Sequence, residues 1–391
     1  MKRVAIIVVL ASAVALTAAA VGVELWVRAT WDPVRGRPGL FVGDAARIEK
    51  LAPGYDGWYA GVPVHTNSLG FRDPREYKIR KGPKTFRVLV LGDSVTFGHG
   101  SLYETTYPYL LEQKLRSWRG DVEWQVWNLG VPGYSTAQEL AYLRDVGPIY
   151  RPDVVIVAFF ENDVRDDNAV RTPSRLDVVA SRVKTYLRRR WYSIDWYRRR
   201  YEQARLRWVA SAEERRIASD AAAAERNLFD RPADTAIIAA QRLTDPAPLG
   251  DAQLASERCP NPQIERFSAE AYRAQRGFRP WLASVRQLQA LARTGEYRLM
   301  FFINAAPRLC QTADLFDARG TADQNAFLLA ILGDGTPAVS SHDAFLRYRP
   351  SQMPLAGGHS IGNSNAVKAG VLFAFLKAQL EAHEFKRSAE S

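Results

Sequence analysis

Four short apolar runs mark out the central part of the chain. They are FRVLVLGD (86–93), EWQVWNLG (123–130), DVVIVAFF (153–160) and YRLMFFIN (297–304). Each run is nearly continuous in apolar residues and is separated from the next by a segment with helical spacing. Such runs are typical of parallel strands that helices cover on both faces. The pattern therefore predicts an α/β fold built on a parallel sheet.

The segments between the runs show the apolar spacing of amphipathic helices. Tyr107, Leu111 and Leu115 fall on one helical stripe after the first run. After the second run, Thr136 and Glu139 stand three residues apart and predict a capping box that opens the next helix. A last helix is expected from about Asn365 to His383.

A long segment follows the third run. It extends from Asp163 to Gly277, about 115 residues, whereas connections in such folds usually have about 2 to 6 residues. Its alanine and arginine content favours helix, most strongly in SDAAAAERN at 219–227. We expect an inserted, mostly helical subdomain.

The N-terminus has no charged residue in the twenty positions from Val4 to Val23, which follow Lys2 and Arg3. Twenty helical residues span a hydrocarbon core of roughly 30 Å, so the segment predicts a membrane anchor. Ala18, Ala19 and Ala20 form an A-x-A sequence, which leaves a cleaved signal peptide and a secreted product as the alternative. The Pro/Gly-rich stretch from Trp31 to Pro63 predicts an irregular, partly extended tether.

The net charge of +11 is concentrated in one place. Ten Lys and Arg residues against two acids lie between Arg182 and Arg207, which supplies +8 of that charge. The near balance elsewhere argues against a nucleic-acid-binding domain. Trp191, Tyr192 and Trp196 interleave with the arginines of this stretch, a composition that suits a membrane interface, an acidic glycan or a solvated helical cap.

The two cysteines, Cys259 and Cys310, could form one disulfide or remain buried thiols.

Candidate chemistry lies where the predicted strands end, because ligands of open parallel sheets bind outside the carboxyl ends of the strands. Ser94 follows the first strand, Gly133 lies in a glycine-rich turn after the second, and Asn162 follows the third. A serine can serve as a nucleophile, and backbone N–H groups or an Asn amide can stabilise an oxyanion. Alone, Asp93 with Ser94 could merely cap a helix, and the other two could be ordinary turn residues.

Together these residues resemble the SGNH (GDSL) hydrolase family. GDSVTFG (92–98) is similar to its first block, N-x-G-x-x-G (128–133) to its second, and Asn162 stands at the Asn of its third. NSLGFRD (67–73) resembles a lead-in of membrane-anchored bacterial members. The resemblance implies a three-layer α/β sandwich with a flavodoxin-like sheet. It also implies that Ser94 is the nucleophile and that Ser94, Gly133 and Asn162 form the oxyanion hole.

The resemblance further implies a catalytic histidine just before the last helix. GGHSIGN (357–363) places His359 there, and His342 is the second choice. The family pattern has an aspartate three residues before this histidine, but this chain has Ala356. A backbone carbonyl could orient the ring, Asp343 could do so, or the site could have become a binding pocket. Phe160 is a second departure, since glycine is usual two residues before the Asn.

These observations predict a serine-dependent esterase, deacylase or acyltransferase. The resemblance to anchored family members implies that its substrate is an acylated small molecule, lipid or polysaccharide of the cell envelope. The alternative is a catalytically weakened protein that binds a glycan or an assembly partner. The chain lacks P-loop, GxGxxG, HExxH and CxxC motifs, and we expect no cofactor and no metal. The expected divisions are an anchor (1–27) facing the periplasm or exterior, a tether (28–66), a domain in two parts (67–162 and 278–385) and the basic insertion (163–277).

Overall fold

The computed structural model describes residues 2–31, 39–165, 174–208, 211, 241–256, 259, 267–294, 297–310, 312–317, 321–356 and 358–390. Its centre is a parallel sheet of five strands in the order β11-β8-β7-β5-β6. The strands are β5 (Thr85–Gly92), β6 (Glu123–Gly130), β7 (Val154–Phe159), β8 (Arg298–Ile303) and β11 (Ala338–Ser340). Numbered along the chain, the order from the β6 edge is 2-1-3-4-5, which is the flavodoxin-like arrangement. The four predicted strands are confirmed, and β11 is an additional strand of only three residues.

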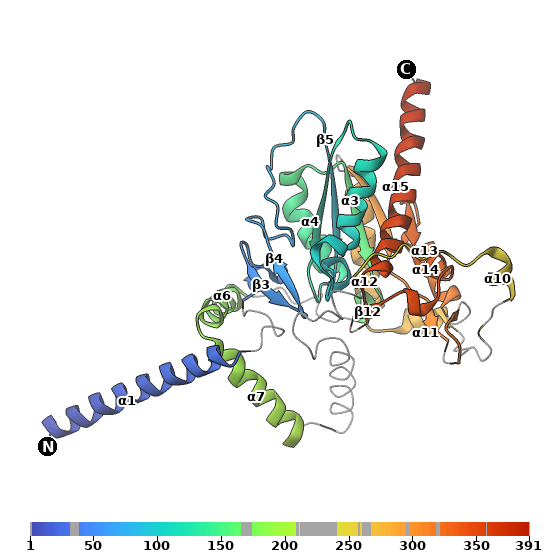
Figure 1. The fold of residues 1–391 in the computed structure, drawn as a ribbon. Coiled ribbons are helices and arrows are strands. Elements are labelled where there is room, and N and C mark those ends of the chain that lie inside the picture. The colour runs from blue at the N-terminus through green and yellow to red at the C-terminus, as the bar shows by residue number, and fades with distance from the viewer. Residues whose placement is uncertain are drawn as a thin grey trace.

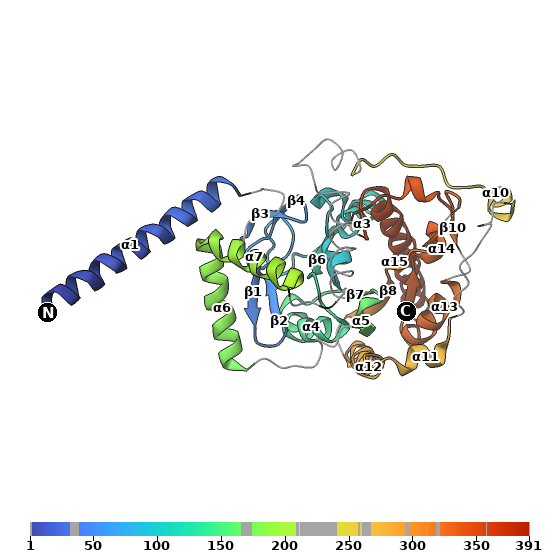
Figure 2. The ribbon, with the colours of Figure 1, turned by 90° about the horizontal axis from the view of Figure 1, so that it is seen from below.

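Helices cover both faces of the sheet, as predicted (Figure 2). On one face, α3 (Tyr107–Trp118) and α15 (Asn363–Glu390) pack against a core that includes Val88 and Val90. On the other face, α4 (Thr136–Tyr150), α12 (Phe278–Thr294) and α13 (Ala322–Leu332) pack against Leu89 and Leu91. Successive strand residues point to opposite faces, so a strand buried on both sides must be apolar throughout.

The predicted capping box is displaced by one residue. Ser135 is the N-cap of α4, and its N–H donates to Gln138 Oε1 at 3.1 Å. Thr136 is already helical and its hydroxyl donates to Asp163 at 3.2 Å. Glu139, the expected capping acid, is fully buried instead. The prediction that Thr136 and Glu139 form the box was therefore wrong.

The apolar N-terminus forms α1 (Lys2–Ala29), which is long and apolar enough to cross a membrane. It projects from the body as a separate rod (Figure 1). The irregular tether was a wrong prediction, because two antiparallel hairpins follow. They are β1 (Phe41–Asp44) with β2 (Ile48–Leu51), and β3 (Asp56–Tyr59) with β4 (Val62–His65). Ala60 and Gly61 both have positive φ, so this Pro/Gly-rich sequence supplies a tight hairpin turn rather than irregular chain.

In the described part of the segment 163–277 the elements are helices. They are α5 (Asn162–Arg165), α6 (Arg175–Arg190), α7 (Tyr192–Trp208), α10 (Asp251–Ser256) and α11 (Ala269–Ala274). The helix-prone stretch 219–227 lies outside the described residues. Cys259 and Cys310 form a disulfide, which joins this segment to the chain after β8. The remaining elements are α2 (Ser94–Phe97), β9 (Arg308–Leu309), β10 (Phe316–Asp317), α14 (His342–Phe345), β12 (Leu355–Ala356) and β13 (His359–Ser360).

Candidate active site

Ser94 is the first residue of α2 and follows the carboxyl end of β5 directly. The strand order reverses between β5 and its neighbours β6 and β7, and such a switch point is where flavodoxin-like sheets bind ligands. Asp93 caps α2, since its carboxylate accepts the Val95 N–H at 2.8 Å. A Cβ at Gly92 would lie 2.0 Å from Thr96 Oγ1, so only glycine fits at this turn. The turn therefore presents the Ser94 hydroxyl at the rim of the sheet.

His359 meets Ser94 at this rim. Its Nε2 lies 2.8 Å from Ser94 Oγ, although the two residues are 265 positions apart in the chain. His359 belongs to β13, which pairs with β12 so that Ala356 and His359 are backbone partners. Both side chains are half-buried, so the pair is accessible from solvent. This contact is the arrangement that activates a serine hydroxyl by a general base.

Gly133 and Asn162 come from the two strands next to β5. The Val131 N–H donates to the Gly92 carbonyl at 3.0 Å, which fixes the β6 turn beside the Ser94 turn. Gly133 has φ of +82°, a conformation that a side chain would strain. In the described part of the chain, the N–H groups of Ser94 and Gly133 have no hydrogen-bond acceptor.

Asn162 begins α5 and contacts Asp93, the residue that precedes Ser94. Its Nδ2 donates to Asp93 Oδ2 at 3.2 Å, which occupies one of its two amide hydrogens. Among the described residues, the second amide hydrogen has no acceptor. Two backbone donors and one amide donor thus belong to the turns around Ser94, and all three are uncharged.

The other candidate residues form a separate cluster. His342 is buried, and its two ring nitrogens contact Thr321 Oγ1 and Asp343 Oδ1, each at 2.7 Å. His342 is therefore not free to act as the base. The contacts of the Asp343 carboxylate go to His342, and its side chain is 86% exposed. The structure does not bring Asp343 to His359.

Two residues that sequence reasoning did not assign support the pair. The His99 ring stacks on the His359 ring with 4.3 Å between centroids, and burial lowers the pKa of His99 to about 3. His99 is thus a neutral neighbour at physiological pH. Arg72, from the lead-in NSLGFRD, is fully buried and donates to the carbonyls of Phe97, Gly98 and Ser101. It holds the chain that leaves α2. The conspicuous NSLGFRD pattern was the only available sign of this role.

A small cavity adjoins the pair. It has a volume of about 250 Å³, and its lining includes Val95, Phe160, Gly358 and Lys368. Phe160, the second departure from the family pattern, therefore lines a pocket and is not simply a core residue. Lys368 is 2% exposed, and burial lowers its pKa to about 7. Burial also raises the pKa of Asp93.

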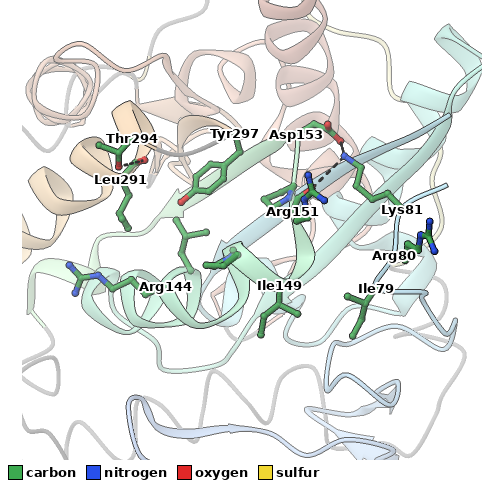
Figure 3. A pocket seen from close by; sticks show the side chains of 14 residues that line it. Ile79, Arg80, Lys81, Arg144, Ile149, Arg151, Asp153, Leu291, Thr294 and Tyr297 are labelled. Carbon is green, nitrogen blue, oxygen red and sulfur yellow. Dashed lines mark hydrogen bonds and ion pairs between the residues drawn. The ribbon is translucent and has the colours of Figure 1, made fainter. Parts of the chain in front are cut away.

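A larger cavity, of about 1130 Å³, lies elsewhere (Figure 3). Lys81 and Asp153, which bond each other at 2.5 Å, stand just before β5 and β7, so this cavity is at the amino edge of the sheet. It is remote from Ser94, which follows the carboxyl edge. Among the described residues no group of three or more His, Cys, Asp or Glu could hold a metal ion.

The structure thus combines a flavodoxin-like strand order with a Ser94–His359 contact at the carboxyl edge of the sheet. The model of the GDSL-like Lipase/Acylhydrolase family matches residues 88–288. The chain belongs to this family. The match includes Ser94, Gly133 and Asn162 and ends before His359, whose assignment therefore depends on its contact with Ser94.

Comparison with solved structures found distant similarities. A catalytic mutant of an acetylxylan esterase from Geobacillus stearothermophilus is 12% identical, with 74% of this chain and 93% of that chain covered and a TM-score of 0.38. An alpha/beta hydrolase enzyme from the metagenome of Lake Arreo, Spain, is 15% identical, with 74% and 94% covered and a TM-score of 0.36. A two-domain esterase active on acetylated mannans is 12% identical, with 75% and 49% covered and a TM-score of 0.35. A comparison with curated proteins found no match.

Proposed function

We propose that the protein is a membrane-anchored carboxylic-ester hydrolase in which Ser94 is the nucleophile and His359 the general base. The observation that carries the proposal is the 2.8 Å contact between His359 Nε2 and Ser94 Oγ. A chain that only bound a ligand would have no need for an imidazole on this hydroxyl. Membership of the acylhydrolase family agrees with the proposal.

In the first half-reaction, Ser94 Oγ attacks the acyl carbonyl carbon while His359 Nε2 takes the hydroxyl proton. The carbonyl oxygen becomes an oxyanion, which the N–H groups of Ser94 and Gly133 and the free amide hydrogen of Asn162 stabilise. Each such donor is typically worth about 10²–10³ in turnover. Collapse of the intermediate breaks the ester bond, and His359 returns its proton to the leaving alcohol.

In the second half-reaction, an acceptor hydroxyl attacks the acyl group on Ser94. His359 takes the proton of the acceptor, and Ser94 leaves with that proton as the product separates. Water as acceptor gives a free carboxylic acid, and a sugar hydroxyl would give a transferred ester. We favour water because the half-buried pair is open to solvent.

The proposed location is the outer face of a membrane, with acylated envelope glycans or lipids as substrates. Two features support export. The helix α1 is long and apolar enough to cross a bilayer, although a signal sequence would pass the same test. The disulfide between Cys259 and Cys310 is a bond that oxidising compartments permit.

A serine-directed fluorophosphonate probe tests the nucleophile and the base. The full chain in detergent should be labelled, Ser94→Ala should abolish labelling, and His359→Ala should slow it by about 10³ or more. Asn162→Ala should lower turnover of p-nitrophenyl acetate by about 10²–10³.

The matched control is Asp343→Asn. Because the Asp343 carboxylate pairs with His342, this variant should keep the wild-type labelling rate and turnover. A folded wild type that stays unlabelled would rule out the enzyme and favour a binding protein. Product analysis in the presence of a sugar acceptor then separates hydrolysis from transfer.

A further inference from the structure

The helices α6 and α7 meet at a wide angle at the base of α1 (Figure 2), and we refer to their solvent-exposed side as the α6–α7 surface. The carboxylate of Glu24, in α1, accepts the N–H groups of Tyr192 and Ser193 at 2.9 Å each. These groups open α7, so α1 supplies the N-terminal cap of that helix. Glu24 is only 7% exposed, which makes this contact part of the folded body.

Aromatic and cationic contacts reinforce the junction. Trp26 meets Trp196 edge to face at 5.6 Å between ring centroids, and Trp31 meets Tyr192 at 5.1 Å. The Arg28 guanidinium lies over the Tyr192 ring at 4.9 Å. These contacts fix the start of α7 close to the point where the apolar part of α1 ends, after Val23.

Both helices run across the direction of α1 instead of continuing it. In Figure 1, α6 is seen nearly end-on while α1 runs across the picture, and α7 turns away from the end of α1. Figure 2 shows α6 crossing the picture vertically, again at a distinct angle to α1. If α1 spans a bilayer, α6 and α7 therefore extend along its surface.

The side chains of this surface suit lipid headgroups. Arg182, Arg190, Arg200 and Arg207 are exposed, and among the described side chains none of them has an acidic partner. Large apolar and aromatic side chains are exposed beside them: Leu176, Val179, Val183, Tyr186, Tyr197, Tyr201 and Trp208. Aromatic residues concentrate at the headgroup level of membranes, and clustered cations attract anionic lipids.

We propose that the α6–α7 surface lies on the bilayer around α1 and binds anionic lipid headgroups. The proposal rests on the anchoring role of α1 that is part of the proposed function. An acidic glycan could be attracted by the same charges, but a glycan does not account for the exposed apolar side chains or for the junction with α1.

Lipid contact through the α6–α7 surface determines how the catalytic domain is oriented on the membrane. An anchor alone would let the domain tilt freely, whereas a second contact through α6 and α7 fixes its orientation. Helix α6 packs against the β1–β2 hairpin, since Thr185 donates to the Phe41 carbonyl at 3.2 Å. The β1–β2 hairpin thus connects α6, where the lipid contact lies, to the rest of the folded protein.

A single fluorescent label can test this, because both natural cysteines are engaged in a disulfide. The full chain carrying Tyr201→Cys, labelled with an environment-sensitive dye, is reconstituted in vesicles of phosphatidylcholine with or without phosphatidylglycerol. A nitroxide on the lipid headgroup serves as quencher. Quenching should be about twofold or more stronger when phosphatidylglycerol is present.

Controls distinguish lipid contact at the α6–α7 surface from an effect of net charge and from membrane insertion of α1. A label at Ser117→Cys, on the exposed side of α3, should not respond to the quencher. The double variant Arg190→Glu with Arg200→Glu should lose at least half of the extra quenching that phosphatidylglycerol causes, roughly as expected for the loss of two headgroup contacts. The pair Lys84→Glu and Lys114→Glu changes the net charge equally and should have no effect. Flotation with the vesicles reports anchoring by α1 independently.

Three results would overturn the proposal. Equal quenching at positions 201 and 117 in floated vesicles would show that the surface faces solvent although α1 is inserted. An equal loss in both charge-reversal pairs would show non-specific attraction. A response to added polygalacturonate without any response to phosphatidylglycerol would assign the surface to an acidic glycan. Failure to float would count against the anchor, and esterase activity measured in detergent would remain unaffected by any of these outcomes.

Discussion

Three buried carboxyl groups lie beneath the Ser94 rim. Asp93 accepts hydrogen bonds from Val95 and Asn162, and Asp163 accepts them from Thr136 and Phe160. Glu139 is the third, and among the described residues its carboxyl oxygens have no hydrogen-bond partner. Burial and the nearby Asp163 and Asp93 raise the pKa of Glu139 well above its ordinary value of 4.5. The fold therefore favours the protonated form of Glu139 over the carboxylate.

This assignment predicts the behaviour of Glu139→Gln. The folded chain holds the Glu139 proton to a higher pH than the unfolded chain, so the free energy of unfolding falls as pH rises above about 4.5. Glutamine cannot ionise, so the variant should lack this fall. Urea unfolding of the detergent-solubilised chain between pH 5 and 8 should show the variant gaining stability relative to wild type as pH rises.

The control for this measurement is Glu270→Gln, an exposed glutamate in α11. It controls for the loss of one carboxylate at an exposed position. A constant difference between Glu139→Gln and wild type would instead mean that Glu139 ionises at its ordinary pKa, and the buried cluster would need another explanation.

Single residues show where sequence reasoning succeeds and where it stops. Ser94, Gly133 and Asn162 could be proposed from the sequence because each follows a recognisable strand, and the carboxyl ends of parallel strands share one edge. Asp343 was a reasonable orienting acid in sequence, but α14 turns it toward His342. The stacking of His99 on His359 joins residues 260 positions apart, and no periodicity encodes such a contact.

At the scale of elements, two buried side chains hold the end of α2, namely Arg72 and Asn128, whose Nδ2 donates to the Thr96 carbonyl at 2.9 Å. The short helix has four residues and cannot hold its own end, because its last carbonyls have no intrahelical partner. Arg72 satisfies the carbonyls of Phe97, Gly98 and Ser101 from outside, and its guanidinium also lies 4.7 Å from the Phe97 ring centroid. Arg72 thereby positions the helix that presents Ser94.

Arg72→Lys should separate this role from charge alone. Lysine keeps the positive charge, but its ammonium group lacks the planar set of N–H donors with which the Arg72 guanidinium reaches several carbonyls. We expect the free energy of unfolding to fall by about 2–3 kcal/mol and labelling of Ser94 by the fluorophosphonate to slow by about tenfold or more. Arg144→Lys, at an exposed site in α4, should change neither quantity. Wild-type labelling in Arg72→Lys would show that α2 holds its own position.

The strands and the hairpins differ in how well their sequences predict them. The runs that form β5 to β8 are apolar on both faces, and short runs of this kind are typical of parallel strands buried between helices. The β3–β4 hairpin lies in a stretch that Pro and Gly make look irregular, yet Val62 and Val64 are buried against the body. Its structure depends on that packing, which a local pattern does not contain.

At the scale of the whole molecule, α1 and the Ser94–His359 pair are joined by continuous packing. Helix α6 packs against the β1–β2 hairpin, and Phe41 of β1 meets Tyr59 of β3 edge to face at 5.6 Å between ring centroids. Tyr59 in turn contacts the ring of His99, which stacks on His359. The N-terminal hairpins thus link α1 and the helices beside it to the edge of the sheet where Ser94 and His359 meet.

The disulfide is the other connection that spans the molecule, and it permits the last prediction. Cys259 and Cys310 are 51 residues apart, and closing such a loop in the unfolded chain is worth about 4 kcal/mol in the chain-entropy model. Replacing both with serine should lower the free energy of unfolding by about 2–4 kcal/mol, as measured by urea denaturation.

These are the only two cysteines in the sequence, so dithiothreitol should destabilise the wild type by a similar amount and leave the double variant unchanged. Equal urea midpoints for the oxidised and reduced wild type would mean that the loop is already constrained without the bond. The Ser94–His359 pair contains neither cysteine, so esterase turnover well below the unfolding transition should be the same in both proteins.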